Sequence, residues 1–286
     1  MNGPSNIIFV GGPGSGKSNY LFRTWIAIER NSGRLVKNGL PPELGYLHDG
    51  ASSLLDGKFA PHTSKDTQFV CEIPIAQRDR QDSTSTLVVP DASGELWLDL
   101  YNKREWPIEW DGLVTGNCGF VLFICVGSPH NVPSLDWISC ERFYRSGVLP
   151  KPTGVPTQVM LVEWLQILRS ITKRKIGFNY APRLSIVLTA WDRVSDERKQ
   201  ESPQDYLDTE FPLLAQFVRS GVHGFDARVF GVSVVGGDLE LDPEFYAEYL
   251  RSERSGVGYA VSQAHGGVER NPDVLMPIYW ALGLET

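Results

Sequence analysis

The chain has 286 residues, of which 42% are apolar and 21% charged, and its formal net charge is −7. This length and composition allow one large α/β domain with insertions or two small domains. The acidic balance argues against a nucleic-acid binder, which needs a basic patch to neutralise phosphates. The four cysteines form no CxxC pair, which favours free thiols over disulfides or zinc, and no apolar run reaches the ~18–20 residues that span a bilayer. We therefore expect a cytoplasmic protein without a membrane span or an export signal.

Short apolar runs alternate with helical patterns along the chain, which predicts a three-layer α/β/α fold around a mostly parallel sheet. Two of the strands flank a polar turn at 78–83 and should pair as one antiparallel hairpin at the sheet edge. The predicted strands are 6–10, 68–75, 84–89, 120–126, 184–188 and 228–232. The predicted helices are 17–29, 45–55, 204–219, 242–254 and 273–282.

A proline-containing insertion at about 128–180 separates the fourth and fifth predicted strands, and it is too short for a core of its own. It ends in a helix whose apolar residues recur at i, i+4, i+7 and i+11. This stripe either packs on the sheet or forms a partner-binding face. The chain is therefore predicted to be a single domain over 1–286, with a C-terminal extension at about 237–286. The stripe consists of Met160, Trp164, Ile167 and Ile171.

A glycine-rich loop joins the first predicted strand to the first predicted helix, with the sequence GGPGSGKS from Gly11 to Ser18. It matches the phosphate-loop pattern G-x-x-x-x-G-K-[ST]. Glycines let successive backbone N–H groups turn inward onto phosphate oxygens, and the helix N-terminus adds its positive end. Lys17 should reach the β- and γ-phosphates, and the Ser18 hydroxyl should ligate Mg²⁺. The residues expected to contact the nucleotide here are Gly12, Pro13, Gly14, Ser15, Gly16, Lys17, Ser18 and Asn19.

A second motif, Asp91-x-x-Gly94, follows the apolar strand at 84–89. GTPases use this spacing: the carboxylate holds Mg²⁺ through water, and the glycine N–H meets the γ-phosphate and so senses its loss. An aspartate in an ordinary turn is the alternative. Asp91 is thus a predicted metal ligand and Gly94 a predicted nucleotide contact.

Thr189-Ala190-Trp191-Asp192 comes directly after the strand at 184–188. It resembles the [NT]KxD motif of GTPases of the translation-factor and Ras-like class. The resemblance implies that Asp192 accepts hydrogen bonds from the ring N–H and amino group of guanine, with Thr189 and Ala190 beside the nucleotide. Ala190 stands where the family has a lysine whose stem lies over the base. Trp191 either supplies stacking surface or belongs to the core.

The same resemblance places two further features. Ser233 and Val234 end the next strand, where such GTPases have a small-residue loop whose backbone N–H meets the guanine oxygen. A switch threonine that ligates Mg²⁺ is expected before the strand at 68–75. Thr63 is the predicted ligand, and Thr67 is the alternative.

The order of these motifs and the long insertion between them resemble the bacterial double-GTPase family, over roughly residues 5–236 and a closing helix. The family implies action with other GTPase and effector proteins in prokaryotic conflict or defence systems. We therefore expect a GTP-binding molecular switch that hydrolyses GTP to GDP with Mg²⁺ and has protein partners. The alternatives are a non-hydrolysing nucleotide-binding scaffold and an ATPase or small-molecule kinase.

Slow hydrolysis is expected, with Lys17 and Glu95 as the catalytic residues. Glu95 follows Asp91-x-x-Gly94, where many relatives carry a glutamine that orients the attacking water. A carboxylate there is repelled by the γ-phosphate, yet it can accept a proton from water. The alternative is that Glu95 only faces solvent at the head of a helix. Arg142 and Arg145 are candidates for an arginine finger supplied by the chain itself.

Overall fold

A computed structural model describes most of the chain. The described residues are 5–60, 69–91, 93–116, 118–133, 145, 154–177, 180–198, 200–222, 224–252, 257–264 and 267–284. Thr63, Thr67, Arg142 and Cys140 lie outside them. The other three cysteines, Cys71, Cys118 and Cys125, are free thiols.

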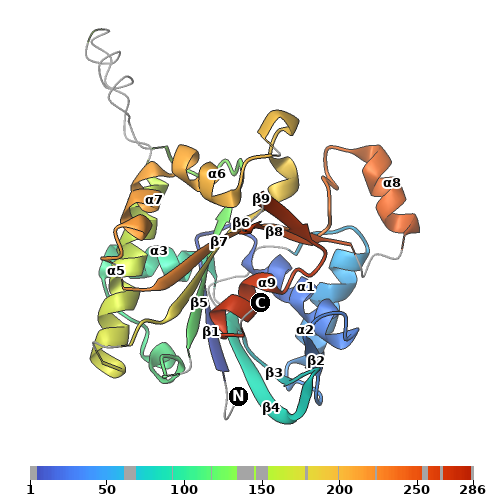
Figure 1. The fold of residues 1–286 in the computed structure, drawn as a ribbon, viewed down its shortest axis with the longest axis horizontal. Helices are drawn as coiled ribbons and strands as arrows, with labels where there is room; N and C mark the ends of the chain where they lie inside the picture. Colours follow the sequence, from blue (N-terminus) through green and yellow to red (C-terminus); the bar gives the residue numbers. More distant parts are fainter. Residues whose placement is uncertain are drawn as a thin grey trace.

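The strands of the described residues form one nine-stranded sheet in the order β2-β3-β4-β1-β5-β6-β7-β8-β9 (Figure 1). Their bounds are Ser5–Val10 (β1), Leu35–Lys37 (β2), Phe69–Gln77 (β3), Arg80–Asp91 (β4), Gly119–Cys125 (β5), Arg183–Thr189 (β6), Asp226–Ser233 (β7), Tyr259–Ala264 (β8) and Gly267–Asn271 (β9).

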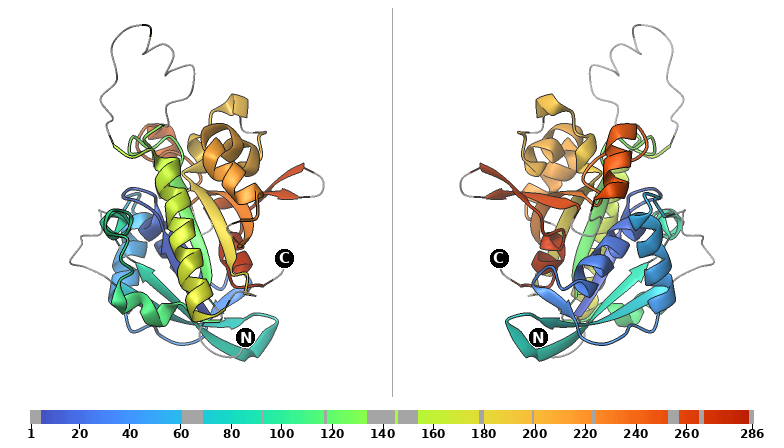
Figure 2. Two further views of the ribbon diagram at one scale, coloured as in Figure 1. Left: turned by 90° about the vertical axis from the view of Figure 1, so that its left-hand side faces the viewer. Right: turned by 90° about the vertical axis from the view of Figure 1, so that its right-hand side faces the viewer.

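Helices cover both faces of this sheet, as Figure 2 shows from two sides. The α-helices are Lys17–Glu29 (α1), Leu44–Leu55 (α2), Gly94–Lys103 (α3), Thr157–Lys175 (α5), Pro203–Glu210 (α6), Pro212–Arg219 (α7), Pro243–Arg251 (α8) and Met276–Ala281 (α9). Short 3-10 helices occur at Ile108–Leu113 (η1), Trp191–Arg193 (η2) and Asp196–Arg198 (η3). Within the described part of the chain, none of the helices combines the length and apolarity needed to cross a membrane.

The sheet is parallel only in its centre, where β4, β1, β5, β6 and β7 run side by side. The hairpin of β3 and β4 is confirmed, with Ile73 opposite Leu87. The prediction of a mostly parallel sheet with one antiparallel edge is wrong at the other edge, where β7, β8 and β9 are antiparallel. Strand β9 is exposed along most of its length and carries Glu269 and Arg270. Its sequence therefore lacks the apolar alternation that signals a strand.

One predicted helix is two helices in the structure. The stretch predicted as 204–219 breaks between Glu210 and Pro212, where α6 ends and α7 begins. Proline has no backbone N–H to donate and its ring clashes with the preceding turn, so it starts α7 rather than continuing α6. The closing helix is also shorter than predicted. It was expected over 273–282, whereas α9 spans Met276–Ala281.

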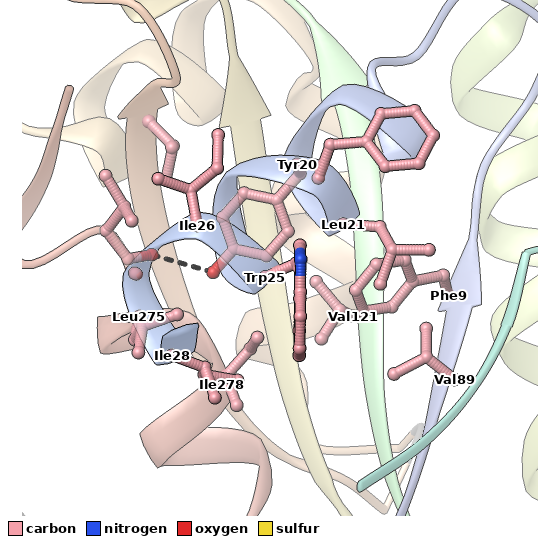
Figure 3. Packing of buried hydrophobic residues seen from close by; sticks show 14 of the residues in the cluster. Phe9, Tyr20, Leu21, Trp25, Ile26, Ile28, Val89, Val121, Leu275 and Ile278 are labelled. Atoms are coloured by element: carbon pink, nitrogen blue, oxygen red, sulfur yellow. Dashed lines mark hydrogen bonds between the residues drawn. The ribbon is translucent and has the colours of Figure 1, made fainter. Parts of the chain in front are cut away.

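Two apolar cores lie on opposite faces of the sheet. The first packs α1, α2, α8 and α9 onto the strands, and Figure 3 shows its centre around Tyr20 and Trp25. The Tyr20 hydroxyl donates a hydrogen bond of 2.8 Å to the Val274 carbonyl, so the core also holds the segment that leads into α9 (dashed in Figure 3). Burial raises the pKa of Tyr20 well above its ordinary value, and this keeps the hydroxyl a donor.

The second core packs α3, α5, α6 and α7 onto the other face. The predicted stripe of α5 contributes Trp164 and Ile171 to this core, which agrees with its packing on the sheet. Trp164 is fully buried between Trp97 of α3 and the strands, and its indole N–H donates a hydrogen bond of 2.9 Å to the Trp97 carbonyl. The rings of Trp97 and Trp110 are 5.0 Å apart, so three tryptophans join the helix after β4 to α5.

Replacing Trp164 by alanine removes a fully buried ring together with this hydrogen bond. We expect Trp164→Ala to lower the free energy of unfolding by about 3–5 kcal/mol, measured by denaturant titration. Val159→Ala is the matched control on the same helix, since Val159 is 38% exposed and should change stability by less than about 0.5 kcal/mol. Equal effects of the two substitutions would show that Trp164 does not hold α5 in place.

Candidate functional site

The glycine-rich loop curls back on itself between β1 and α1. Gly14 and Gly16 have positive φ angles of 67° and 91°, a region that side chains disfavour. A Cβ on Gly11 would lie 2.6 Å from the Ser15 hydroxyl oxygen, and one on Gly16 would lie 3.0–3.2 Å from Thr189. The loop therefore needs glycine at these positions. Gly16 directly precedes α1, so the first N–H groups of that helix face the inside of the curl.

Lys17 places a buried positive charge inside the loop. Only 6% of the residue is exposed. Its Nζ donates hydrogen bonds to the carbonyls of Gly11 (2.8 Å) and Gly12 (3.0 Å) and lies 3.4 Å from the Ser15 hydroxyl. A buried ammonium beside a helix N-terminus and several glycine amides favours a multiply charged anion.

Two hydrogen bonds fix the loop to its neighbours. The Thr189 hydroxyl, at the end of β6, donates to the Ser15 carbonyl at 2.8 Å across 174 residues of sequence. The Asn19 side-chain oxygen, in the first turn of α1, accepts a bond of 2.9 Å from the Ala60 backbone N–H. The loop is thereby held against the carboxyl ends of the parallel strands, the edge at which open α/β sheets bind ligands.

A cavity of about 290 Å³ opens at this edge. Seven residues predicted from the sequence to bind a nucleotide line it together, although they come from three separate segments. These are Gly14, Gly16, Asn19, Thr189, Ala190, Asp192 and Val234. The volume lies near the lower end of the range for small-molecule sites, about 300–1,000 Å³.

Asp192 is one of the acidic residues that line the cavity, with Asp238 and Glu240. Burial raises its pKa, while a hydrogen bond from the Ser233 hydroxyl, a backbone hydrogen bond and the charge of Arg193 act in the opposite direction. Ser233 is fully buried and also accepts a 2.9 Å bond from the Gly236 N–H, so its hydroxyl is held in place beside the carboxylate. The carboxylate is thus oriented and partly desolvated, which suits it to accept hydrogen bonds from a ligand.

The turn that presents Asp192 has an unusual backbone. Ala190 has φ 53° and ψ 42°, a left-handed conformation that costs a residue with a Cβ roughly 1–2 kcal/mol. Trp191 next to it is 4% exposed, packs edge-on against Tyr206, and belongs to the second core. Gly231 leaves room for this indole, since a Cβ there would lie 2.4 Å from it. The core interpretation of Trp191 therefore holds, and the anchored indole fixes the strained turn.

The segment after β4 meets the glycine-rich loop directly. A Cβ on Gly94 would lie 2.1 Å from the Pro13 backbone nitrogen and 2.4 Å from the Gly12 carbonyl carbon. Strand β4 ends at Asp91, and Glu95 lies in the first turn of α3. Asp91, Gly94 and Glu95 thus belong to the segment that meets the glycine-rich loop, whereas Thr63 and Thr67 lie outside the described residues. Of the arginine-finger candidates, Arg145 is exposed and Arg142 lies outside the described residues.

Several cavity residues carry no motif and were missed by sequence reasoning. Phe59 precedes a segment outside the described residues, and Cys125 ends β5 with a pKa raised by burial. Arg193 follows the Asp192 motif, and Asp238 and Glu240 belong to the loop after β7. Of these residues, only Arg193 could have been predicted to line the cavity, because it directly follows Asp192 in the sequence.

The glycine cradle, the buried lysine and the carboxylate at the end of β6 define a phosphate-loop nucleotide-binding protein. The chain belongs to the Double-GTPase 1 family, whose model matches residues 8–281. This confirms the family resemblance of the motifs and supports GTP binding.

Other comparisons add less. A search of curated proteins finds no match. Among solved structures, the chain is similar to the "S. cerevisiae Ski7 GTPase-like domain, bound to GTP", with 16% identity and a TM-score of 0.42. That alignment covers 88% of this chain and 50% of the other, so this chain spans about half the length of that structure.

The burial of Asp192 predicts a pH-dependent effect on the ligand-free protein. Because its pKa is raised in the folded state, ionised Asp192 opposes folding at neutral pH, and this cost disappears as the pH falls through the raised pKa. Asp192→Asn should therefore raise the Tm at pH 7, and the gain should shrink toward pH 3.8, the ordinary pKa. Asp49→Asn, at an exposed position of α2, is the control. A gain that did not depend on pH would contradict this assignment.

Proposed function

We propose that the protein is a GTPase that binds GTP and GDP with Mg²⁺, hydrolyses GTP slowly, and acts as a molecular switch in the cytoplasm. The family assignment supports GTP binding. The observation that carries the proposal is the hydrogen bond from Thr189 to Ser15, because it joins the segment with Asp192 to the phosphate loop around one cavity. A nucleotide would match this cavity, with its base toward the Asp192 segment and its phosphates toward the glycine-rich loop.

Guanine recognition is assigned to Asp192 and to the loop after β7. The ring N–H and amino group of guanine match two acceptors on one carboxylate, and adenine lacks that donor pair. Ser233 holds the carboxylate, and the Val234 backbone lies in the same cavity wall. Ala190 supplies no lysine stem, so less of the base surface is covered from this position.

Phosphate binding is assigned to the backbone from Gly12 to Ser18, with Lys17 as the cation. The ligand would take over the Nζ hydrogen bonds that now go to the Gly11 and Gly12 carbonyls. Mg²⁺ would be held by the Ser18 hydroxyl and the switch threonine Thr63, and through water by Asp91. It would neutralise charge on the β- and γ-phosphates.

Hydrolysis is assigned to Glu95 as the group that positions the attacking water. It follows Gly94, which lies against the phosphate loop, so its backbone is close to the place of the γ-phosphate. A carboxylate is repelled by that phosphate, and this repulsion accounts for a slow intrinsic rate. The switch function would act through protein partners, as expected of a family of paired GTPases in prokaryotic conflict or defence.

A non-hydrolysing scaffold is the second candidate, favoured by Glu95 in place of glutamine and by Ala190 in place of lysine. Titration with fluorescent GTP and ATP analogues, followed by phosphate release under excess GTP, separates the candidates. Tight GTP binding with turnover supports the switch, and binding without turnover supports the scaffold. A preference for ATP would reject both.

Lys17→Ala should lose most triphosphate affinity, because it removes the buried cation.

Asp192→Asn tests the base-reading role. The amide replaces one acceptor by a donor, and xanthine carries an oxygen where guanine carries its amino group. We expect GTP affinity to fall by roughly 10²-fold or more and XTP to become the preferred ligand, since mismatched buried polar groups discriminate strongly. Competition titrations with GTP and XTP measure the change. Unchanged GTP affinity would remove Asp192 from the base site.

Gly94→Ala tests the contact between α3 and the phosphate loop. A methyl group would overlap main-chain atoms of Pro13 and Gly12, so the start of α3 must withdraw. We expect GTP hydrolysis to fall at least tenfold, while GDP affinity changes less than threefold because GDP does not use this segment. Gly112→Ala is the control, since its Cβ would meet open space. Normal turnover by Gly94→Ala would show that this contact has no role in hydrolysis.

A further inference from the structure

Arg193 joins two loops across the wall of the nucleotide cavity. Its Nε lies 3.4 Å from an Asp238 carboxylate oxygen, and its Nη2 donates a hydrogen bond of 3.1 Å to Glu240. Arg193 belongs to η2, directly after Asp192, while the two acids belong to the loop after β7. All three side chains line the cavity. We call these three residues the Arg193 clasp.

Both ends of the clasp are fixed. On the side of η2, the buried Trp191 anchors the turn. On the other side, an oxygen of Asp238 accepts hydrogen bonds from the N–H groups of Glu240 (2.8 Å) and Leu241 (3.0 Å). Although burial alone would raise the pKa of Asp238, these backbone bonds and Arg193 lower it, so the acid stays ionised at neutral pH.

The Arg193 clasp also lies near the position from which the family's lysine would cover the guanine base. The family lysine that would cover the base is replaced by Ala190, three residues before Arg193. A guanidinium is planar and packs well against aromatic faces, and its long stem covers apolar surface. The side chain of Arg193 is 33% exposed, so it forms the outer wall rather than the floor of the cavity. The two loops that it joins are those that carry Asp192 and Val234.

We infer that the Arg193 clasp closes the outer wall of the base cavity, replaces the absent lysine, and sets how slowly guanine nucleotide is released. This inference rests on the proposed function. In this assignment Arg193 is a positioning residue: it holds the Asp192 turn and the loop after β7 at the spacing that the base requires. Opening the clasp separates those two loops and lets the nucleotide leave.

The test is the rate of release of fluorescent GDP after mixing with excess unlabelled GDP. We expect Arg193→Ala to release GDP about three- to tenfold faster, with the association rate changed by less than twofold. Arg193→Lys should give an intermediate rate, because one ammonium replaces a fork that reaches two carboxylates. Asp238→Asn keeps the acceptor for the backbone bonds and removes the charge. Its effect should not add to that of Arg193→Ala.

Arg219→Ala is the matched control. Arg219 ends α7 and pairs with Asp208, and neither residue lines the cavity. Its loss should leave GDP release unchanged. Raising the salt concentration should speed release from the unmodified protein and have less effect on Arg193→Ala, whereas a general loss of stability would not produce that difference.

The outcomes separate the inference from the proposed function. If the unmodified protein binds no guanine nucleotide, the proposed function fails. If it binds GDP and Arg193→Ala releases it at the unmodified rate, with an unchanged Tm, the clasp inference alone is overturned. Additive effects of Arg193→Ala and Asp238→Asn would also overturn it, since the two residues would then act separately.

Discussion

The hydrogen bond from the Thr189 hydroxyl to the Ser15 carbonyl sets the geometry of the whole site. It connects the end of β6 to the middle of the loop that joins β1 to α1. Thr189 also packs against Gly16, where a Cβ would approach within 3.0 Å of the threonine hydroxyl. The left-handed backbone of Gly16 and the position of the end of β6 therefore depend on each other. The amides of the glycine-rich loop and the segment that carries Asp192 are joined as a result.

The other side of the phosphate loop is held by the tryptophans of the second core. The Trp164 ring lies 3.8 Å from the position of a Cβ on Gly12, and the same residue bonds to α3 through the Trp97 carbonyl. Because Trp97 is fully buried, α3 cannot swing away as a rigid body without exposing a large apolar ring. Movement at Gly94 is therefore confined to the first turn of α3, next to Glu95. The fold limits where a nucleotide-dependent change could occur.

The sequence predicted those parts of the fold that depend on local pattern. The bounds of α1 were predicted to the residue, because a glycine-rich turn ends β1 and an apolar pattern follows. The second antiparallel edge was not predicted, since β9 is exposed and the pairing of β8 with β7 joins segments far apart in the sequence. In the site, Asp192 was predicted from its resemblance to the [NT]KxD motif, and the structure places it in the cavity wall. Phe59 and the Arg193 clasp were missed because cavity walls form from residues that meet only in the folded chain.

The acidic groups of the cavity carry an electrostatic cost that the fold does not remove. Asp192 is partly desolvated, and Asp238 and Glu240 add two negative charges against the single guanidinium of Arg193. The Ser233 hydroxyl and one backbone N–H do not fill a carboxylate with about four acceptor sites. A ligand that brings two N–H donors to Asp192 would relieve this cost in addition to making its own contacts. Selectivity for a base with that donor pair would therefore come partly from relieving this cost, because a base without the pair leaves the buried carboxylate unsatisfied.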